Sequence, residues 1–64
     1  MAEKDLINFT VVSQGRSGTS TYIRKAPSWW SIDTVWLSER CWFMPGTEVT
    51  IIDPDHNLKT FKRS

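Results

Sequence analysis

A single cysteine and a single histidine in a chain of 64 residues most restrict the folds open to this sequence. A chain this short buries only about 60% of its unfolded surface, and many domains of similar size add disulfides or a structural metal. Cys41 has no second cysteine to pair with, and Cys41 and His56 together fall short of a structural zinc site. We therefore expect no metal and no cofactor, and aromatic side chains, four Trp, three Phe and one Tyr, that compensate for a thin core.

The charge balance excludes further classes of protein. Eight Lys or Arg against seven Asp or Glu give a net charge of +1, unlike a protein that binds duplex DNA mainly through phosphates. No apolar run approaches the ~20 residues of a membrane span, and the segment MAEKDL lacks the apolar core of a signal peptide. We expect one domain over residues 1–64, frayed at 1–5 and 63–64, in the cytoplasm and without membrane contact.

Alternating apolar residues predict strands in both halves of the chain. The segment LINFTVV places Ile7, Phe9 and Val11 on one face. The glycine- and serine-rich residues 13–19 predict a flexible loop between this strand and the next. The expected strands span residues 6–12, 19–25, 47–53 and 58–62, and the first two form an antiparallel hairpin.

A helical period separates the two pairs of strands. Pro27 disfavours helix before it, and Ser28 is the expected N-cap, with Ser31 as a competing one. The predicted helix runs from Trp29 to about Trp42, and Pro45 with Gly46 ends it.

This order predicts an α+β fold, a two-layer ββαββ domain in which one helix packs on a three- to four-stranded, mainly antiparallel sheet. The strand order stays open at this point, although the helical crossover can set the third strand beside the first, with the fourth at an edge. The expected core joins helix and sheet residues: Ile32, Val35, Trp36, Ile7, Phe9, Val11, Val49 and Ile51.

No catalytic arrangement is recognisable. The loop at residues 15–19 resembles an anion-binding loop only in its glycines and Arg16, and a strand rather than a helix is predicted next. His56 and the carboxylates of Asp53 and Asp55 fit a solvated turn around Pro54, and Cys41 fits a small filler of the fold. We therefore predict that the protein is not an enzyme.

The tryptophans give the strongest functional signal, because one helix cannot direct all of them at one sheet. Trp29 and Trp36 lie about 20° apart on a helical wheel, whereas Trp30 and Trp42 lie well off that direction. Exposed Trp and Met side chains form interface hot spots, although Trp30 and Trp42 could equally fold over the sheet edges as a second small core. The predicted partner-binding surface comprises Trp30, Glu39, Arg40, Trp42, Phe43 and Met44, with Glu39 and Arg40 at its rim.

Basic residues offer an alternative function. If the second and fourth strands are adjacent, their cations form a patch on which single-stranded nucleic acid stacks against aromatic rings. Edge-strand lysines that prevent aggregation explain the same pattern. The residues of this alternative contact are Arg16, Tyr22, Arg24, Lys25, Lys59, Lys62 and Arg63.

Two segments resemble known phage proteins. The stretch MPGTEVTIIDP (residues 44–54), after two strands and a helix, resembles small phage-encoded inhibitors of bacterial RNA polymerase. The stretch ERCWFMPGTEVTII (residues 39–52) is similar to a small two-layer anti-CRISPR protein that acts on type I surveillance complexes. The resemblance implies a non-enzymatic inhibitor or modulator, encoded by a phage or prophage, that binds a host protein complex in the bacterial cytoplasm. A homodimer through the aromatic surface is a further possibility.

Overall fold

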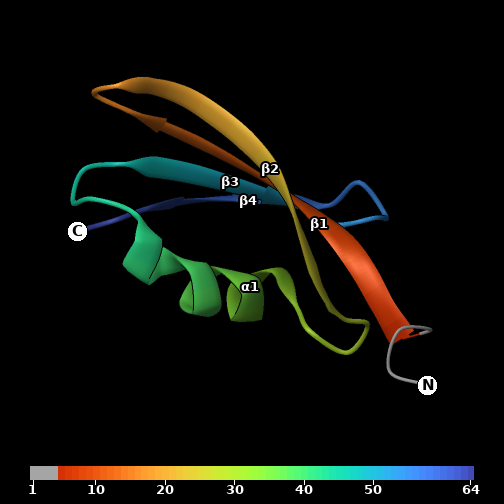
Figure 1. Cartoon of the computed structure of the whole chain (residues 1–64). Coiled ribbons are helices and arrows are strands. Elements are labelled where there is room, and N and C mark those ends of the chain that lie inside the picture. The colour runs from red at the N-terminus through yellow and green to blue at the C-terminus, as the bar shows by residue number, and fades with distance from the viewer. Residues whose placement is uncertain (1–4) are drawn as a thin grey trace.

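The computed structural model describes residues 5–64 and shows one helix beneath a four-stranded antiparallel sheet (Figure 1). The predicted α+β arrangement is therefore confirmed. The elements are β1 (Leu6–Gly15), β2 (Gly18–Pro27), α1 (Ile32–Glu39), the 3-10 turn η2 (Arg40–Trp42), β3 (Glu48–Ile52) and β4 (Leu58–Lys62).

The strand order is β2-β1-β3-β4, and every neighbouring pair is antiparallel. The third strand thus lies beside the first, and the fourth is an edge strand, as the crossover argument allowed. Cross-strand partners share a face, so Val11, Ile51 and Tyr22 lie on the side that faces the helix. Ile23, which is 55% exposed, lies on the opposite, uncovered side with its partner Thr10.

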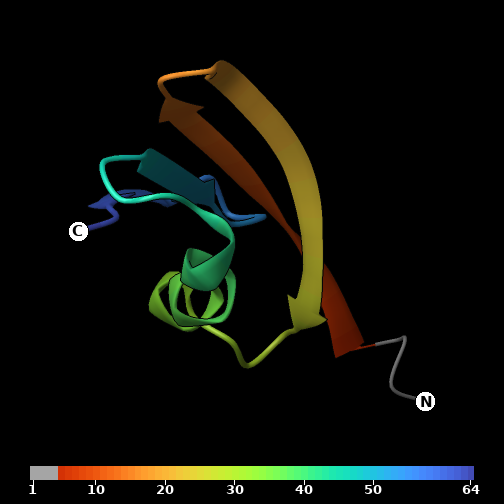
Figure 2. The same cartoon turned by 60° about the vertical axis from the view of Figure 1, so that its left-hand side comes forward.

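The β1–β2 hairpin is longer than the sequence predicted. The expected loop at residues 13–19 is instead a turn of Arg16 and Ser17, since β1 continues to Gly15 and β2 begins at Gly18. Gly18 has φ 124°, a conformation that residues other than glycine rarely adopt, so glycine at this position permits the tight turn. In Figure 2 the resulting ribbon curls along the side of the helix and projects beyond it.

The helix is shorter than predicted and begins at the competing cap. The Ser31 side chain accepts a hydrogen bond from the backbone N–H of Thr34 at 3.3 Å, and this cap fixes the start at Ile32. Trp29 and Trp30 therefore precede the helix, and the helical wheel assigned them wrongly. Trp29 is 77% exposed, whereas Trp30 packs against the core.

The core lies between the helix and the centre of the sheet. Its fully buried side chains are Phe9, Val11, Ala26, Val35, Val49 and Ile51, which include most of the predicted set. Trp36 extends this core toward β4, where its ring stacks on Phe61 at 4.9 Å between centroids. Each buried aliphatic or aromatic side chain contributes about 1.5–3 kcal/mol, so these contacts supply much of the stability of so small a domain.

Both ends of the described chain are tied to the fold. The Asp5 carbonyl accepts a hydrogen bond from the Ser28 N–H at 2.6 Å, and Arg63 N–H donates to the Thr47 carbonyl at 2.9 Å. Arg63, expected to fray, is therefore held beside β3, while the rest of the expected N-terminal fraying, residues 1–4, lies outside the described residues. Within residues 5–64, no helix has the length and apolar character needed to cross a membrane.

Candidate functional site

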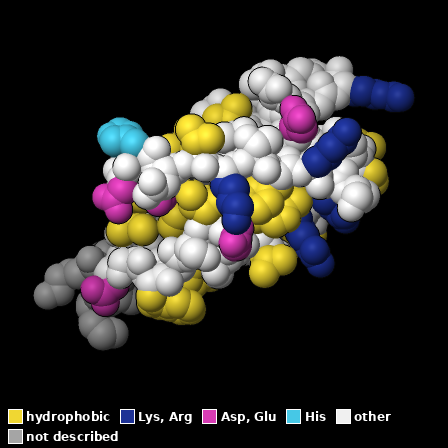
Figure 3. All heavy atoms as spheres, turned by 180° about the vertical axis from the view of Figure 1, so that it is seen from behind, with side chains coloured by type: hydrophobic (Ala, Val, Ile, Leu, Met, Phe, Trp, Pro, Cys, Tyr) yellow, Lys and Arg dark blue, Asp and Glu magenta, His cyan; other side chains and the backbone are white. Residues whose placement is uncertain are grey.

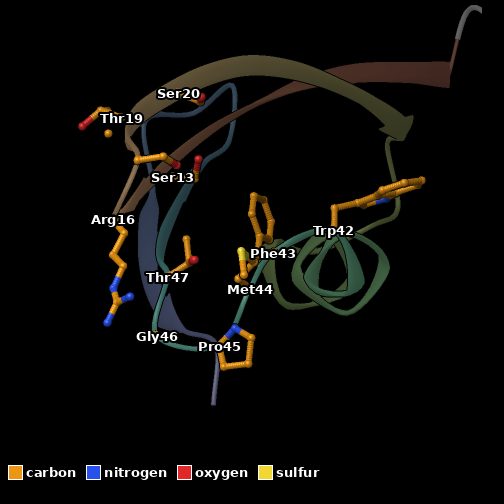
Figure 4. Close-up of a pocket in the computed structure, with 13 residues that line it drawn as sticks. Ser13, Arg16, Thr19, Ser20, Trp42, Phe43, Met44, Pro45, Gly46 and Thr47 are labelled. Atoms are coloured by element: carbon orange, nitrogen blue, oxygen red, sulfur yellow. The ribbon is translucent and has the colours of Figure 1, made fainter.

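A cleft of about 510 Å³ separates the tip of the β1–β2 hairpin from the segment that joins η2 to β3. In Figure 4, Phe43 and Met44 project between these two walls, and Arg16 extends from the hairpin tip. Serine, threonine and glycine form the hairpin wall, which is why their composition alone suggested a loop. The lining residues are Ser13, Gly15, Arg16, Ser17, Gly18, Thr19, Ser20, Trp42, Phe43, Met44, Pro45, Gly46 and Thr47.

A second hollow of about 470 Å³ adjoins the first, since Ser13, Ser20, Trp42 and Phe43 line both. It continues along β2 toward the end of α1, where Tyr22 and Glu39 complete its lining. The two hollows together form an elongated groove, which we call the hairpin cleft.

The backbone after η2 explains why the aromatic wall faces outward. Phe43 leaves the 3-10 turn in an extended conformation, with φ −110° and ψ 147°, and its N–H bonds to the Arg40 carbonyl at 3.2 Å. Pro45 and Gly46 then reverse the chain, with the Thr47 N–H bound to the Met44 carbonyl at 3.1 Å. This turn places the side chains of residues 42–44 at the cleft.

Four members of the predicted partner-binding surface line the cleft: Trp42, Phe43, Met44 and Glu39. Trp42 and Met44 are 76% and 77% exposed, and Phe43 is half-buried between them. Phe43 stacks at 6.3 Å on Trp36, so one of its faces already belongs to the core. Arg40 begins η2 directly before this group and is exposed.

Glu39 does not lie at the rim, because it is only 6% exposed. Its carboxylate accepts a hydrogen bond from the Tyr22 hydroxyl at 2.8 Å. Arg24 Nε lies 2.9 Å from the same carboxylate and forms an ion pair with it, although the Nε–H group makes no hydrogen bond. The Ser38 hydroxyl adds a longer contact of 3.5 Å. The sequence carried a signal for this network: Glu39 follows the buried Val35 by four residues, and Tyr22 and Arg24 share one face of a strand.

The environment of the cluster alters the acidity of Tyr22. Burial raises the pKa of the Tyr22 phenol well above its ordinary value near 10.0, and the hydrogen bond to Glu39 and the negative charge of that carboxylate raise it further. The positive charge of Arg24 opposes this shift only in part. Tyr22 is therefore a neutral hydrogen-bond donor at physiological pH.

Trp30 belongs to the same cluster rather than to the cleft. Its ring is partly buried against the core, and the Arg24 guanidinium lies 5.8 Å from the ring centroid, within reach of a cation–π interaction. Trp30 therefore packs on the ion pair from the segment between β2 and α1, and it lines neither hollow of the cleft.

The basic residues of the alternative function do not form one patch. Arg24 and Lys25 lie on β2, while Lys59 and Lys62 lie on β4, at the opposite edge of the sheet. The charge of Arg24 is paired with Glu39, and Lys59 Nζ is paired with Asp33 at 2.9 Å. Arg63 lies beside η2, where its Nε donates to the Arg40 carbonyl at 3.1 Å.

The turn between β3 and β4 shows a structural role for its carboxylate. Asp53 Oδ1 accepts hydrogen bonds from the backbone N–H groups of Asp55 and Asn57, at 3.0 and 2.8 Å. Desolvation opposes ionisation of Asp53, but these bonds outweigh it and lower the pKa of the carboxyl. His56 adopts φ 70° at the apex and is exposed.

Cys41, expected as a filler of the fold, is exposed on η2, since this short turn has no side packed on the sheet at that position. Among residues 5–64, no group of three or more His, Cys, Asp or Glu side chains is arranged to hold a metal ion.

Comparisons of the chain with protein-family models, with curated proteins and with solved structures found no match.

Proposed function

We propose that this chain is a non-catalytic protein-binding domain that takes its partner at the hairpin cleft. The observation that carries the proposal is the exposure of Trp42 and Met44, at 76% and 77%, on either side of Phe43. Large side chains of this kind dominate the binding energy of protein interfaces when they enter a partner's pocket. Met44 adds an adaptable apolar surface that fits irregular partners.

The resemblance to phage-encoded inhibitors supports a more specific proposal. A small, rigid domain that presents an apolar anchor with a polar rim can block a much larger host assembly by occupying one of its surfaces. We take a type I CRISPR surveillance complex and bacterial RNA polymerase as the first partners to test, and inhibition as the direction of the effect.

The test compares two tryptophans of equal exposure. Trp42→Ala removes the proposed anchor, whereas Trp29→Ala removes a ring that is 77% exposed but lies before α1, outside the cleft. Immobilised chains are incubated with each purified assembly, and retention and inhibition are measured. We expect Trp42→Ala to lose retention by about tenfold or more, as for a hot-spot residue, and Trp29→Ala to behave as the unmodified chain.

Folding is controlled by the unfolding midpoint. Because Trp42 is largely exposed, its replacement is expected to change stability by only about 0.5 kcal/mol. Equal retention of the two variants contradicts the proposed surface. If neither purified assembly is retained, the same pair of variants is applied to a bacterial lysate, and a protein retained by Trp29→Ala but not by Trp42→Ala replaces the named partners.

A further inference from the structure

Charged side chains are distributed unevenly along the molecule, and the cleft lies at its basic end. Arg16 lines the cleft, Arg40 lies two residues before Trp42, and Arg63 donates from Nε to the Arg40 carbonyl. Lys62 lies at the same end, because it pairs across the sheet with Glu48, which in turn pairs with Gln14 near the hairpin tip. On the face shown in Figure 3, the Lys and Arg side chains lie mostly toward this end.

Carboxylates concentrate at the other end of the sheet. Asp53 and Asp55 lie in the β3–β4 turn, and Asp5 directly precedes β1. Among the residues that the structure describes at the cleft end, Glu48 is the exposed carboxylate, while Glu39 is buried and paired with Arg24. The field at the mouth of the cleft is therefore positive although the whole chain has a net charge of only +1.

The cations around the cleft are available to a partner. Within residues 5–64, the ion pairs of the fold use Arg24 and Lys59, and none uses Arg16, Arg40 or Lys62. A negatively charged partner would gain these interactions without breaking an internal one. Complementary charge at a rim raises the rate of association and selects among partners.

The walls of the cleft indicate the shape of what it accepts. A hollow of about 510 Å³ that continues into one of about 470 Å³ is elongated, and each part has the size of a site for a few side chains. Hydroxyl groups of Ser13, Ser20 and Thr47 lie on the walls, opposite the apolar surface of Phe43 and Met44. Such a groove suits a chain that alternates polar and apolar groups.

We infer that the hairpin cleft binds an acidic, extended peptide segment, with an apolar side chain against Phe43 and Met44 and carboxylates facing Arg16 and Arg40. This inference rests on the proposed function and specifies the chemistry of the partner. A peptide is favoured over single-stranded nucleic acid, because Trp42 is the one largely exposed ring among the described residues that line the cleft, while Tyr22 and Phe43 are partly buried. Phe43 is already stacked on Trp36, and stacking of successive bases needs successive free rings.

The experiment selects peptides from a displayed library of random segments of about twelve residues against the full chain at low salt, long enough to span the groove in extended form. The selected peptides are then titrated by tryptophan fluorescence. Arg16→Glu reverses a charge at the cleft. As a matched control, Lys25→Glu reverses a charge on the face of β2 that points away from the helix, outside the cleft lining. A single-stranded oligonucleotide serves as competitor.

We expect the selected peptides to carry more Asp and Glu than the unselected library, together with an apolar residue. Arg16→Glu should weaken their binding on the order of tenfold and Lys25→Glu less than about twofold, and added salt should weaken binding by screening. Selected peptides that are neutral or basic, equal binding to both variants, stronger binding of the oligonucleotide, or no selection at all overturns the inference.

The same titrations separate this inference from the proposed function. If the selected peptides lack acidic residues but bind Trp42→Ala more weakly than the unmodified chain, the cleft is still the protein-binding site. Only its preference for acidic segments is then wrong. Peptides that bind Trp42→Ala and Trp29→Ala equally well contradict the cleft as the binding site, whatever their charge.

Discussion

The ion pair between Arg24 and Glu39 yields the sharpest prediction on stability. Arg24→Met keeps the aliphatic stem of the side chain and removes the guanidinium with its charge, which leaves the Glu39 carboxylate with Tyr22 and Ser38 as its remaining partners. The Glu39 side chain is 8% exposed, so water cannot replace the lost cation, whereas the Arg24 side chain is 38% exposed. The perturbation therefore isolates a nearly buried carboxylate.

The magnitude follows from these exposures. Removing one partner of a fully buried ion pair costs about 3–5 kcal/mol, and the exposure of Arg24 reduces this to about 2–3 kcal/mol. Loss of the cation–π contact with Trp30 adds about 0.5–1 kcal/mol. The sum of about 3 kcal/mol is a large share of the total stability of about 3–10 kcal/mol expected for a domain of 64 residues.

Urea unfolding followed by tryptophan fluorescence at neutral pH measures this change. The double variant Arg24→Met with Glu39→Gln removes both charges but keeps an oxygen for the Tyr22 hydroxyl, so it should regain at least half of the loss. Lys59→Met is the matched control, because it breaks an ion pair with Asp33 that is more than half exposed on both sides and is worth under about 1 kcal/mol. An Arg24→Met variant no less stable than Lys59→Met, or a double variant less stable than the single one, refutes the reasoning.

Three further predictions concern titration and backbone conformation. Because the folded-state pKa of Tyr22 is raised, the stability that Tyr22 contributes is complete below the unfolded pKa near 10.0 and is lost as the pH rises beyond it. Phenolate absorbance should therefore appear at a higher pH than for a free tyrosine, and at a lower pH in Glu39→Gln than in the unmodified chain. The folded-state pKa of Asp53 is lowered, so the stability that Asp53 contributes is present above the unfolded pKa of 3.8 and is lost as the pH falls through the folded-state pKa. Asp53→Ala removes the acceptor of the Asn57 N–H, so the Asn57 amide should exchange faster than in the unmodified chain even at neutral pH. His56→Gly should stabilise the domain by about 0.5–1 kcal/mol in thermal unfolding, because glycine adopts the φ of 70° freely, and a similar gain in His56→Ala would contradict this explanation.

The sequence predicted the parts of the fold in which apolar residues alternate. Phe9 and Val11 in β1, and Val49 and Ile51 in β3, are buried as their spacing indicated, and β4 has the predicted bounds. A two-residue period leaves few alternatives once one face of a strand must cover a helix. The fold class followed from these segments.

The ends of the hairpin could not be predicted in the same way. Ser13 and Ser20 pair across β1 and β2, but they bring no apolar surface, so their strand conformation depends on the continuing hydrogen-bonded ladder and on the tight turn at Gly18. Polar composition therefore indicated a loop where the structure has one wall of the cleft. The start of α1 was similarly ambiguous between two serine caps, and that choice exchanged the environments of Trp29 and Trp30.

The buried ion pair links the stability of the domain to the shape of the cleft. Glu39 is the last residue of α1, and Arg40–Trp42 follow it directly, while Tyr22 and Arg24 hold its carboxylate from β2. These contacts tie the end of α1, directly before η2, to β2. The cluster thus joins the helix to the strand immediately before the segment that carries Trp42. The rim position predicted for Glu39 was wrong because the residue is buried, and its carboxylate instead joins α1 to Tyr22 and Arg24 on β2.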